Sequence, residues 1–263
     1  MADSYLLTIL SKGKIADHII ANSVNKINYI GFKQYCQKEI YQSLYFESYF
    51  SGNIDKETCL SINHQLINAF KTYMDYKVLP FSEIKKNLVA KFEPNSLYIY
   101  KRIMTDITEN SKDSAINTYY QSPYNDCENY WKHNAMFLWL DNWLKESFFN
   151  KLRSEEQLGY NVSCSTYEVT GRFGYSFWVK GDKEEPNYVS GRIEEFLKIM
   201  KGELDAMAEK EFAEMCQVVI EGSCSVALKL KKDTKLIWSQ QIQTHFYKFD
   251  YKEILASELG NMN

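Results

Sequence analysis

The sequence predicts an α+β fold in which helices pack on a largely antiparallel sheet. Strand-like runs are followed by helical runs in blocks, rather than alternating one by one. Two of the runs, 160–169 and 172–181, are joined by Thr170-Gly171 and have the pattern of a β-hairpin. The 263 residues are 45% hydrophobic and 25% charged, which is typical of a globular protein that can bury a core.

The first third of the chain is predicted to be helix, strand and helix. Apolar residues recur at helical spacing over 15–47, and Gly31 is expected to break this helix in two. The run 45–54 alternates aromatic and polar residues before Ser-Gly-Asn, which predicts a strand and a turn. A second apolar stripe predicts a helix over 55–75. Pro80 makes continuation of the helix unfavourable, so we expect a domain boundary there.

The remaining chain supplies the sheet and most of the helices. Three strand-like runs follow the boundary, at 87–92, 96–104 and 114–122. Apolar residues every three or four positions predict a long helix over 126–155, which leads into the hairpin. Pro186 occupies a favourable first helical position, and helix is expected from there to about 246.

The charge and cysteine content exclude several classes of protein. A net charge of -3 and a pI of about 5.9 argue against a protein whose main partner is nucleic acid or an anionic membrane. No run approaches the 18 apolar residues of a membrane span, and no signal peptide is visible, so we expect a cytoplasmic protein. The six cysteines form no CxxC pair and are expected to be reduced thiols.

The chain contains no complete catalytic or metal-binding motif. Its four histidines are His18, His64, His133 and His245. None has a second histidine within five residues, so the helical zinc motifs HExxH and HxxEH are absent. A GxSxG nucleophile elbow and a GxxxxGK[ST] phosphate loop are also absent. The sequence therefore predicts no catalytic residue and no metal ligand in this chain.

The stretch FFNKLRSEEQLGY, at 148–160, has two interpretations. Arg153 is a planar donor fork and Tyr160 carries a hydroxyl, so both side chains can donate to one substrate oxygen. In the other interpretation the residues only end a helix: Arg153 complements the helix dipole, Gly159 is the cap and Tyr160 begins a strand. Local physics alone favours the cap, because helix ends are far commoner than binding sites.

The same stretch resembles a signature in the C-terminal half of the insulinase family, the zinc metallopeptidases with an inverted HxxEH motif that include insulin-degrading enzyme and pitrilysin. Further segments resemble the family at YFESYFSGNI, TYYQSP, KGDKEEPNYVSGRIEEFLKIM and WSQQIQTHFYKFDYKE. The resemblance extends from about residue 15 to the end of the chain.

The resemblance implies an architecture of four homologous α+β domains in two halves around a chamber. Residues 1–80 then correspond to the C-terminal part of the third domain, and 81–263 to a fourth domain that lacks its closing helix-strand-helix. Zinc is implied in the missing N-terminal half, with which this chain would be partnered. Arg153 and Tyr160 are implied to bind the backbone of peptide substrates, and the fragment alone is expected to be inactive.

A non-catalytic role is the alternative that the resemblance leaves open. Inactive subunits of mitochondrial processing peptidase and core proteins of a respiratory complex share this kind of domain and serve as scaffolds. The presence of Arg153 and Tyr160 favours the peptidase. An HxxEH motif upstream of this chain would decide between the two.

Overall fold

The computed structural model describes residues 2–40, 42–73, 76–84, 88–101, 113–123, 129–169, 171–223, 230–242 and 247–262. Chain contacts divide the protein into two units. The first, which we call the sheet unit, contains Met1–Lys14, Leu88–Ser225 and Asp250–Asn263. The second, the helical unit, contains Ile15–Asn87 and Val226–Phe249. The assignment of 1–80 and 81–263 to two homologous insulinase-like domains stays a prediction.

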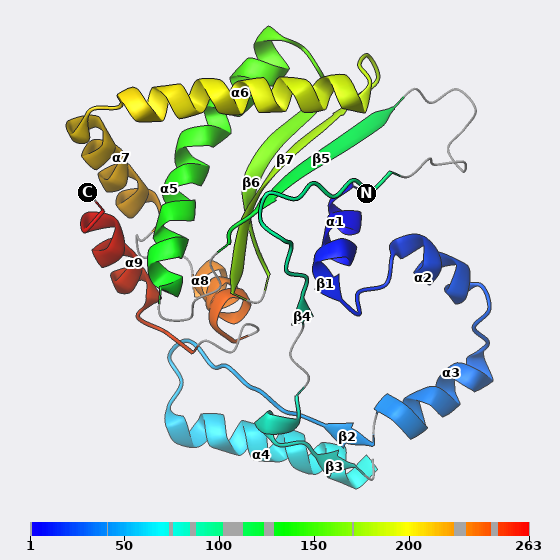
Figure 1. Ribbon diagram of the computed structural model, residues 1–263. Coiled ribbons are helices and arrows are strands. Elements are labelled where there is room, and N and C mark those ends of the chain that lie inside the picture. Colours follow the sequence, from blue (N-terminus) through cyan, green and yellow to red (C-terminus); the bar gives the residue numbers. More distant parts are fainter. Residues whose placement is uncertain are drawn as a thin grey trace. The chain divides into compact units, whose positions relative to one another are not determined.

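The sheet unit is built on a three-stranded antiparallel sheet (Figure 1). Its strands are β5 (Ser114–Gln121), β6 (Asn161–Val169) and β7 (Arg172–Gly181), in the order β5-β7-β6. The β6–β7 hairpin pairs Val169 with Arg172 and continues to Asn161 opposite Lys180. Gly171 in the turn has φ of +79°, a conformation that glycine adopts without steric cost. The predicted hairpin and the predicted strand at 114–122 are confirmed.

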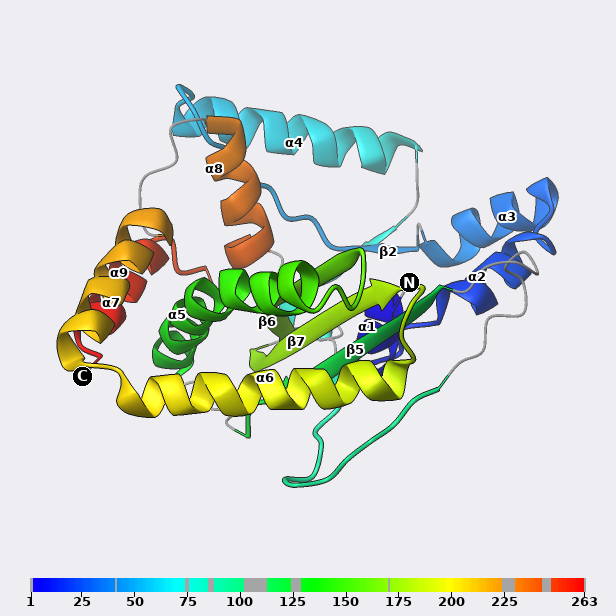
Figure 2. The same cartoon turned by 90° about the horizontal axis from the view of Figure 1, so that it is seen from above.

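Two long helices cover one face of this sheet and form the main core with it. They are α5 (Tyr130–Phe149) and α6 (Pro186–Ala206), and they lie beside the three strands in Figures 1 and 2. Phe148 of α5 is fully buried, with its ring centroid 5.2 Å from Phe177 of β7 and 5.3 Å from Phe196 of α6. Large buried aromatic rings of this kind dominate core energetics. The α+β fold predicted from the sequence is confirmed.

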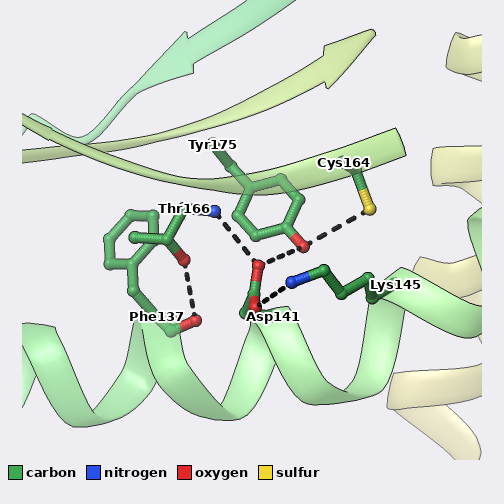
Figure 3. A network of polar contacts seen from close by, with 6 residues as sticks. All are labelled: Phe137, Asp141, Lys145, Cys164, Thr166 and Tyr175. Carbon is green, nitrogen blue, oxygen red and sulfur yellow. Dashed lines mark hydrogen bonds and ion pairs between the residues drawn. The ribbon is translucent and has the colours of Figure 1, made fainter. Parts of the chain in front are cut away.

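A polar network fixes the middle of α5 to the hairpin (Figure 3). Asp141 Oδ1 accepts a hydrogen bond from the Thr166 backbone N–H at 3.2 Å and lies 3.3 Å from Tyr175 Oη. Asp141 Oδ2 binds Lys145 Nζ at 3.0 Å. The Tyr175 hydroxyl also lies 3.4 Å from Cys164 Sγ, and burial raises the pKa of that thiol to about 11. Burial thus favours the neutral thiol form of Cys164, which packs in the core.

Further helices of the sheet unit pack against α5. These are α7 (Glu209–Ser223) and α9 (Tyr251–Gly260), and the Trp139 ring of α5 lies 4.8 Å from Phe212 of α7. Helix α9 lies beyond the helical region predicted to about 246, and its Leu255 and Leu259 are buried. Outside this group, α1 (Ala2–Leu10) packs beside β5, and the short strands β1 (Ser11–Lys12) and β4 (Leu88–Val89) pair antiparallel.

The helical unit contains the two predicted N-terminal helical regions. Its elements are α2 (Asp17–Val24), α3 (Tyr29–Tyr35) with a π-helical turn at Cys36–Ile40, α4 (Lys56–Tyr73), a 3-10 turn at Phe81–Glu83, and α8 (Leu230–Ile237) with a π-helical turn at Trp238–Ile242. The first helical region breaks before Asn28 rather than at Gly31. The Asn28 side chain accepts a hydrogen bond from the Gly31 N–H at 2.8 Å, which makes Asn28 the N-cap of α3.

Two predicted strands are wrong where the structure describes them. No strand forms over 45–54; the nearby parallel pair is only β2 (Ser43–Leu44) with β3 (Lys77–Val78). The aromatic residues of that run serve side-chain packing instead, since the Phe46 ring lies 5.3 Å from Phe70 of α4. The run 96–101 is also not a strand, and 102–104 lie outside the described residues.

None of the helices in the described ranges is long and apolar enough to cross a membrane.

Candidate functional site

The stretch singled out from the sequence forms the end of α5 and the turn into β6. A π-helical turn at Asn150–Glu155 continues α5 directly. Such turns are rare and are frequent at functional sites. The Leu158 N–H donates to the Leu152 carbonyl at 2.9 Å, and both of these leucine side chains are buried in the core. The buried side chains of Leu152 and Leu158 therefore anchor both ends of the turn in the core.

Gln157, and not Gly159, ends the helix with a left-handed residue. Its φ is +54°, whereas Gly159 has no positive φ. The interpretation of Gly159 as the helix cap is therefore wrong. A left-handed conformation costs a non-glycine residue about 1–2 kcal/mol, so the surrounding contacts must hold Gln157 in place.

Gly159 instead allows a close backbone crossing. A Cβ added to it would lie 2.4 Å from the Lys180 carbonyl oxygen, and one added to Gly181 would lie 2.8 Å from the Gly159 Cα. Real Cβ atoms do not approach backbone atoms this closely. The two glycines let the chain pass directly against the end of β7, which places Tyr160 beside Lys180.

Tyr160 belongs to a cluster with Asp113 and Lys180. Its hydroxyl donates to Asp113 Oδ2 at 2.7 Å, and the same oxygen lies 3.0 Å from Lys180 Nζ. The Lys180 ammonium also lies 5.2 Å from the centre of the Tyr160 ring. Hydrogen bonds from Tyr160 and Lys180 lower the pKa of Asp113, and contacts with Tyr160 and Asp113 raise the pKa of Lys180. These shifts favour the charged forms of Asp113 and Lys180, and the Tyr160 residue beside them is 49% exposed.

Arg153 lies in the π-helical turn and is partly exposed. Its charged neighbours are paired: Lys151 binds Glu155 at 2.8 Å, and Arg192 binds Glu156 at 2.7 Å. Within the described ranges, the Arg153 side chain forms no hydrogen bond or ion pair. The structure thus places Arg153 before the turn and Tyr160 after it, with no direct contact between them among the described residues. Tyr160 is 49% exposed and Arg153 is partly exposed, but the Tyr160 hydroxyl is already hydrogen-bonded to Asp113.

The region also contains Asp113, Lys180, Glu156 and Arg192, none of which the sequence predicts as part of it. Asp113 is 47 residues from Tyr160 along the chain and meets it because Ser114 pairs with Gly181 in the β5–β7 register. No local motif marks such a pair. The one local signal is the density of charged residues at 153–156, which includes Glu156 as well as Arg153.

Comparison with known proteins shows which proteins this fold and turn are similar to. Residues 139–238 match the family described as PQQ synthase PqqF-like, C-terminal lobe domain 4. The crystal structure of pitrilysin is similar with a TM-score of 0.51 and 25% sequence identity, over 59% of this chain and 16% of that chain. The chain therefore carries the fold of a C-terminal lobe domain of this class.

Curated relatives agree with this class. A nardilysin-like protein of Arabidopsis thaliana is 25% identical over 230 residues, 85% of this chain and 21% of the relative. Insulin-degrading enzyme of Homo sapiens is 25% identical over 213 residues, 81% of this chain and 20% of the relative. Protease 3 of Escherichia coli O157:H7 is 34% identical over 93 residues, 33% of this chain and 10% of the relative. The chain spans about a fifth of the length of the first two relatives.

The homologues of this chain are insulinase-family zinc metallopeptidases, and the match is to their C-terminal half. The resemblance predicted from FFNKLRSEEQLGY is confirmed. The roles of Arg153 and Tyr160 remain predictions.

Proposed function

We propose that this chain is the substrate-clamping part of an insulinase-type zinc metalloendopeptidase that hydrolyses peptides inside a closed chamber. One observation carries the proposal: the turn after α5 carries an Arg153 side chain without a polar partner and a half-exposed Tyr160, inside a segment that matches the family. A capping arginine needs only to lie near the last carbonyls, and an exposed tyrosine is not required for a cap.

The described residues do not fit the zinc site of such an enzyme. Zinc in a catalytic site needs three protein ligands, usually histidine and carboxylate. No group of three or more His, Cys, Asp or Glu side chains suited to a metal is present in the part of the chain that the structure describes. In our proposal, zinc and the base that acts with it would come from the N-terminal half of the same enzyme, which is the partner of this half.

Arg153 and Tyr160 would then hold the substrate backbone. The Arg153 guanidinium offers parallel N–H donors to a peptide carbonyl, and the Tyr160 O–H offers one more. Donors that are fixed before the reaction stabilise developing negative charge on that oxygen. To reach the substrate, the Tyr160 hydroxyl must leave Asp113. Lys180 stays 3.0 Å from the Asp113 carboxylate and keeps its charge compensated during this exchange.

This chain alone is expected to bind no stoichiometric zinc and to cleave no peptide, because its four histidines are scattered. Elemental analysis of the purified chain and a fluorogenic peptide assay measure the two properties. Adding a zinc-bearing N-terminal half should restore cleavage. Stoichiometric zinc together with chelator-sensitive cleavage by the chain alone would show that the division of roles is wrong.

Asp113→Ala is expected to lower the KM of the complete enzyme a few-fold, because the Tyr160 hydroxyl would no longer have to break a charge-assisted hydrogen bond before meeting the substrate. Steady-state peptide cleavage measures the effect. Asp205→Ala is the matched control, since it removes a carboxylate from an exposed ion pair with Lys201 on α6. A higher KM for Asp113→Ala would mean that Asp113 orients Tyr160 toward the substrate and does not compete with it.

A further inference from the structure

The turn that carries Arg153 is joined to α6 by a bidentate ion pair. Arg192 Nε donates to Glu156 Oε2 at 2.7 Å, and Arg192 Nη2 donates to Glu156 Oε1 at 2.7 Å. This is the parallel fork that arginine forms with a carboxylate, and it fixes orientation as well as distance. The two residues are 36 positions apart in the chain. The pair therefore joins two elements of the fold, unlike the ion pairs within single helices.

The Glu156–Arg192 ion pair is partly shielded from solvent, so it can contribute more to stability than a fully exposed pair. The Glu156 side chain is 17% exposed and that of Arg192 is 33% exposed. The Arg192 hydrogen bonds hold the pKa of Glu156 below its usual value, with a further contribution from Lys151 at 3.7 Å. By contrast, the Lys201–Asp205 pair on the same helix α6 is 76% and 64% exposed. Exposed pairs of that kind contribute little to stability.

The position of Glu156 in the turn indicates what the pair does. Glu156 directly precedes Gln157, whose left-handed backbone is unfavourable for a residue with a Cβ. On the far side of Gln157, Leu158 is held by its buried side chain and by its hydrogen bond to Leu152. Glu156 and Leu158 thus hold the strained residue from both sides.

We propose that Glu156 and Arg192 are positioning residues, which hold the turn after α5 in the geometry that directs Arg153 toward the substrate. The proposal rests on the proposed function, since it acts through Arg153. Neither residue needs to touch the substrate. Arginine is required at 192 because a lysine ammonium is a single point charge and cannot form the fork.

The turn itself is tested on this chain without any catalysis. Hydrogen exchange at the Leu158 amide reports the hydrogen bond to Leu152. Arg192→Gln is expected to speed this exchange on the order of tenfold, through local opening of the turn. Exchange at Phe177 in the central strand should not change. Unchanged exchange at Leu158 would overturn the proposal, whatever the enzyme's activity.

The catalytic part is tested in the complete peptidase that contains this chain. Arg192→Gln and Glu156→Gln are each expected to lower kcat/KM about tenfold, because a small displacement of a donor is enough for a loss of that size. Arg192→Lys should restore only part of this loss. Lys201→Gln, on the same helix, should leave kcat/KM unchanged.

A double-mutant cycle with Arg153 separates positioning from general stability. In an Arg153→Ala background, Arg192→Gln should cause less than about a twofold further loss, since it acts through the absent side chain. Multiplicative losses would overturn the proposal and leave the pair a purely structural one. If Arg153→Ala alone leaves kcat/KM unchanged while exchange at Leu158 responds as expected, the proposed function has failed and the pair only stabilises the turn.

Discussion

Removing either donor of the turn after α5 is expected to lower peptide cleavage by the complete enzyme on the order of a hundredfold in kcat/KM, which is typical for loss of one donor at an oxyanion. The two variants are Arg153→Ala and Tyr160→Phe. Each removes a donor that our proposal directs at the substrate carbonyl. A loss confined to kcat would place the interaction in the transition state, and a rise in KM alone would indicate equal binding of substrate and transition state.

Stability measurements distinguish this result from a role in helix capping. As a dipole partner, Arg153 would contribute at most about 1 kcal/mol to the free energy of unfolding and nothing to kcat/KM. Tyr160→Phe retains the ring and removes only the hydroxyl. If the turn is only a helix cap, this substitution should leave the free energy of unfolding almost unchanged. Lys201→Ala is the control for loss of one positive charge, because Lys201 is 76% exposed and distant in sequence from the turn. Wild-type kcat/KM for Tyr160→Phe would show that its hydroxyl serves only Asp113.

Elements with a long, regular apolar pattern were predictable from the sequence. The α5 periodicity, the β6–β7 hairpin and the helix starting at Pro186 were each specified by local chemistry. The strand predicted at 45–54 does not form. Its aromatic residues pack on α4, and an aromatic run of that kind has the same alternation as a strand in a sheet. Alternation of apolar and polar residues indicates only that one face of the segment is buried. The segment becomes a β-strand only where a partner strand pairs with its backbone.

The candidate site was predictable only for the residues inside the signature. Gln157 was missed because a glycine two positions later offered a simpler helix end, and no rule marks glutamine for the left-handed region. Asp113 and Arg192 were missed because each reaches the turn through the tertiary fold, Asp113 by strand register and Arg192 by the packing of α6. The sequence thus indicated candidate donors but not the tertiary contacts that hold the turn around them.

Gly159→Ala is expected to destabilise the sheet unit by about 1–3 kcal/mol, the range for overpacking a well-packed site. The new Cβ would lie 2.4 Å from the Lys180 carbonyl oxygen and 2.9 Å from its carbonyl carbon. These are backbone atoms of the central strand β7, held by pairing with both neighbours, so they cannot move aside as a flexible side chain would. Thermal unfolding should therefore occur roughly 2–12 °C lower, given the usual dependence for a unit of this size.

Gly202→Ala is the matched control, and its expected effect has the opposite sign. Gly202 lies inside α6, and a Cβ added there would meet nothing within 4 Å. Alanine in a helix interior is more favourable than glycine by about 0.5–1 kcal/mol, so the melting temperature should rise slightly. If Gly159→Ala and Gly202→Ala melt at the same temperature, the close crossing of Gly159 over β7 is not rigid. Tyr160 would then be held at Lys180 by the Asp113 cluster alone, and the kcat/KM of Gly159→Ala should stay near that of the wild type. A rigid crossing predicts instead that kcat/KM falls together with stability, since the displaced backbone carries Tyr160 with it.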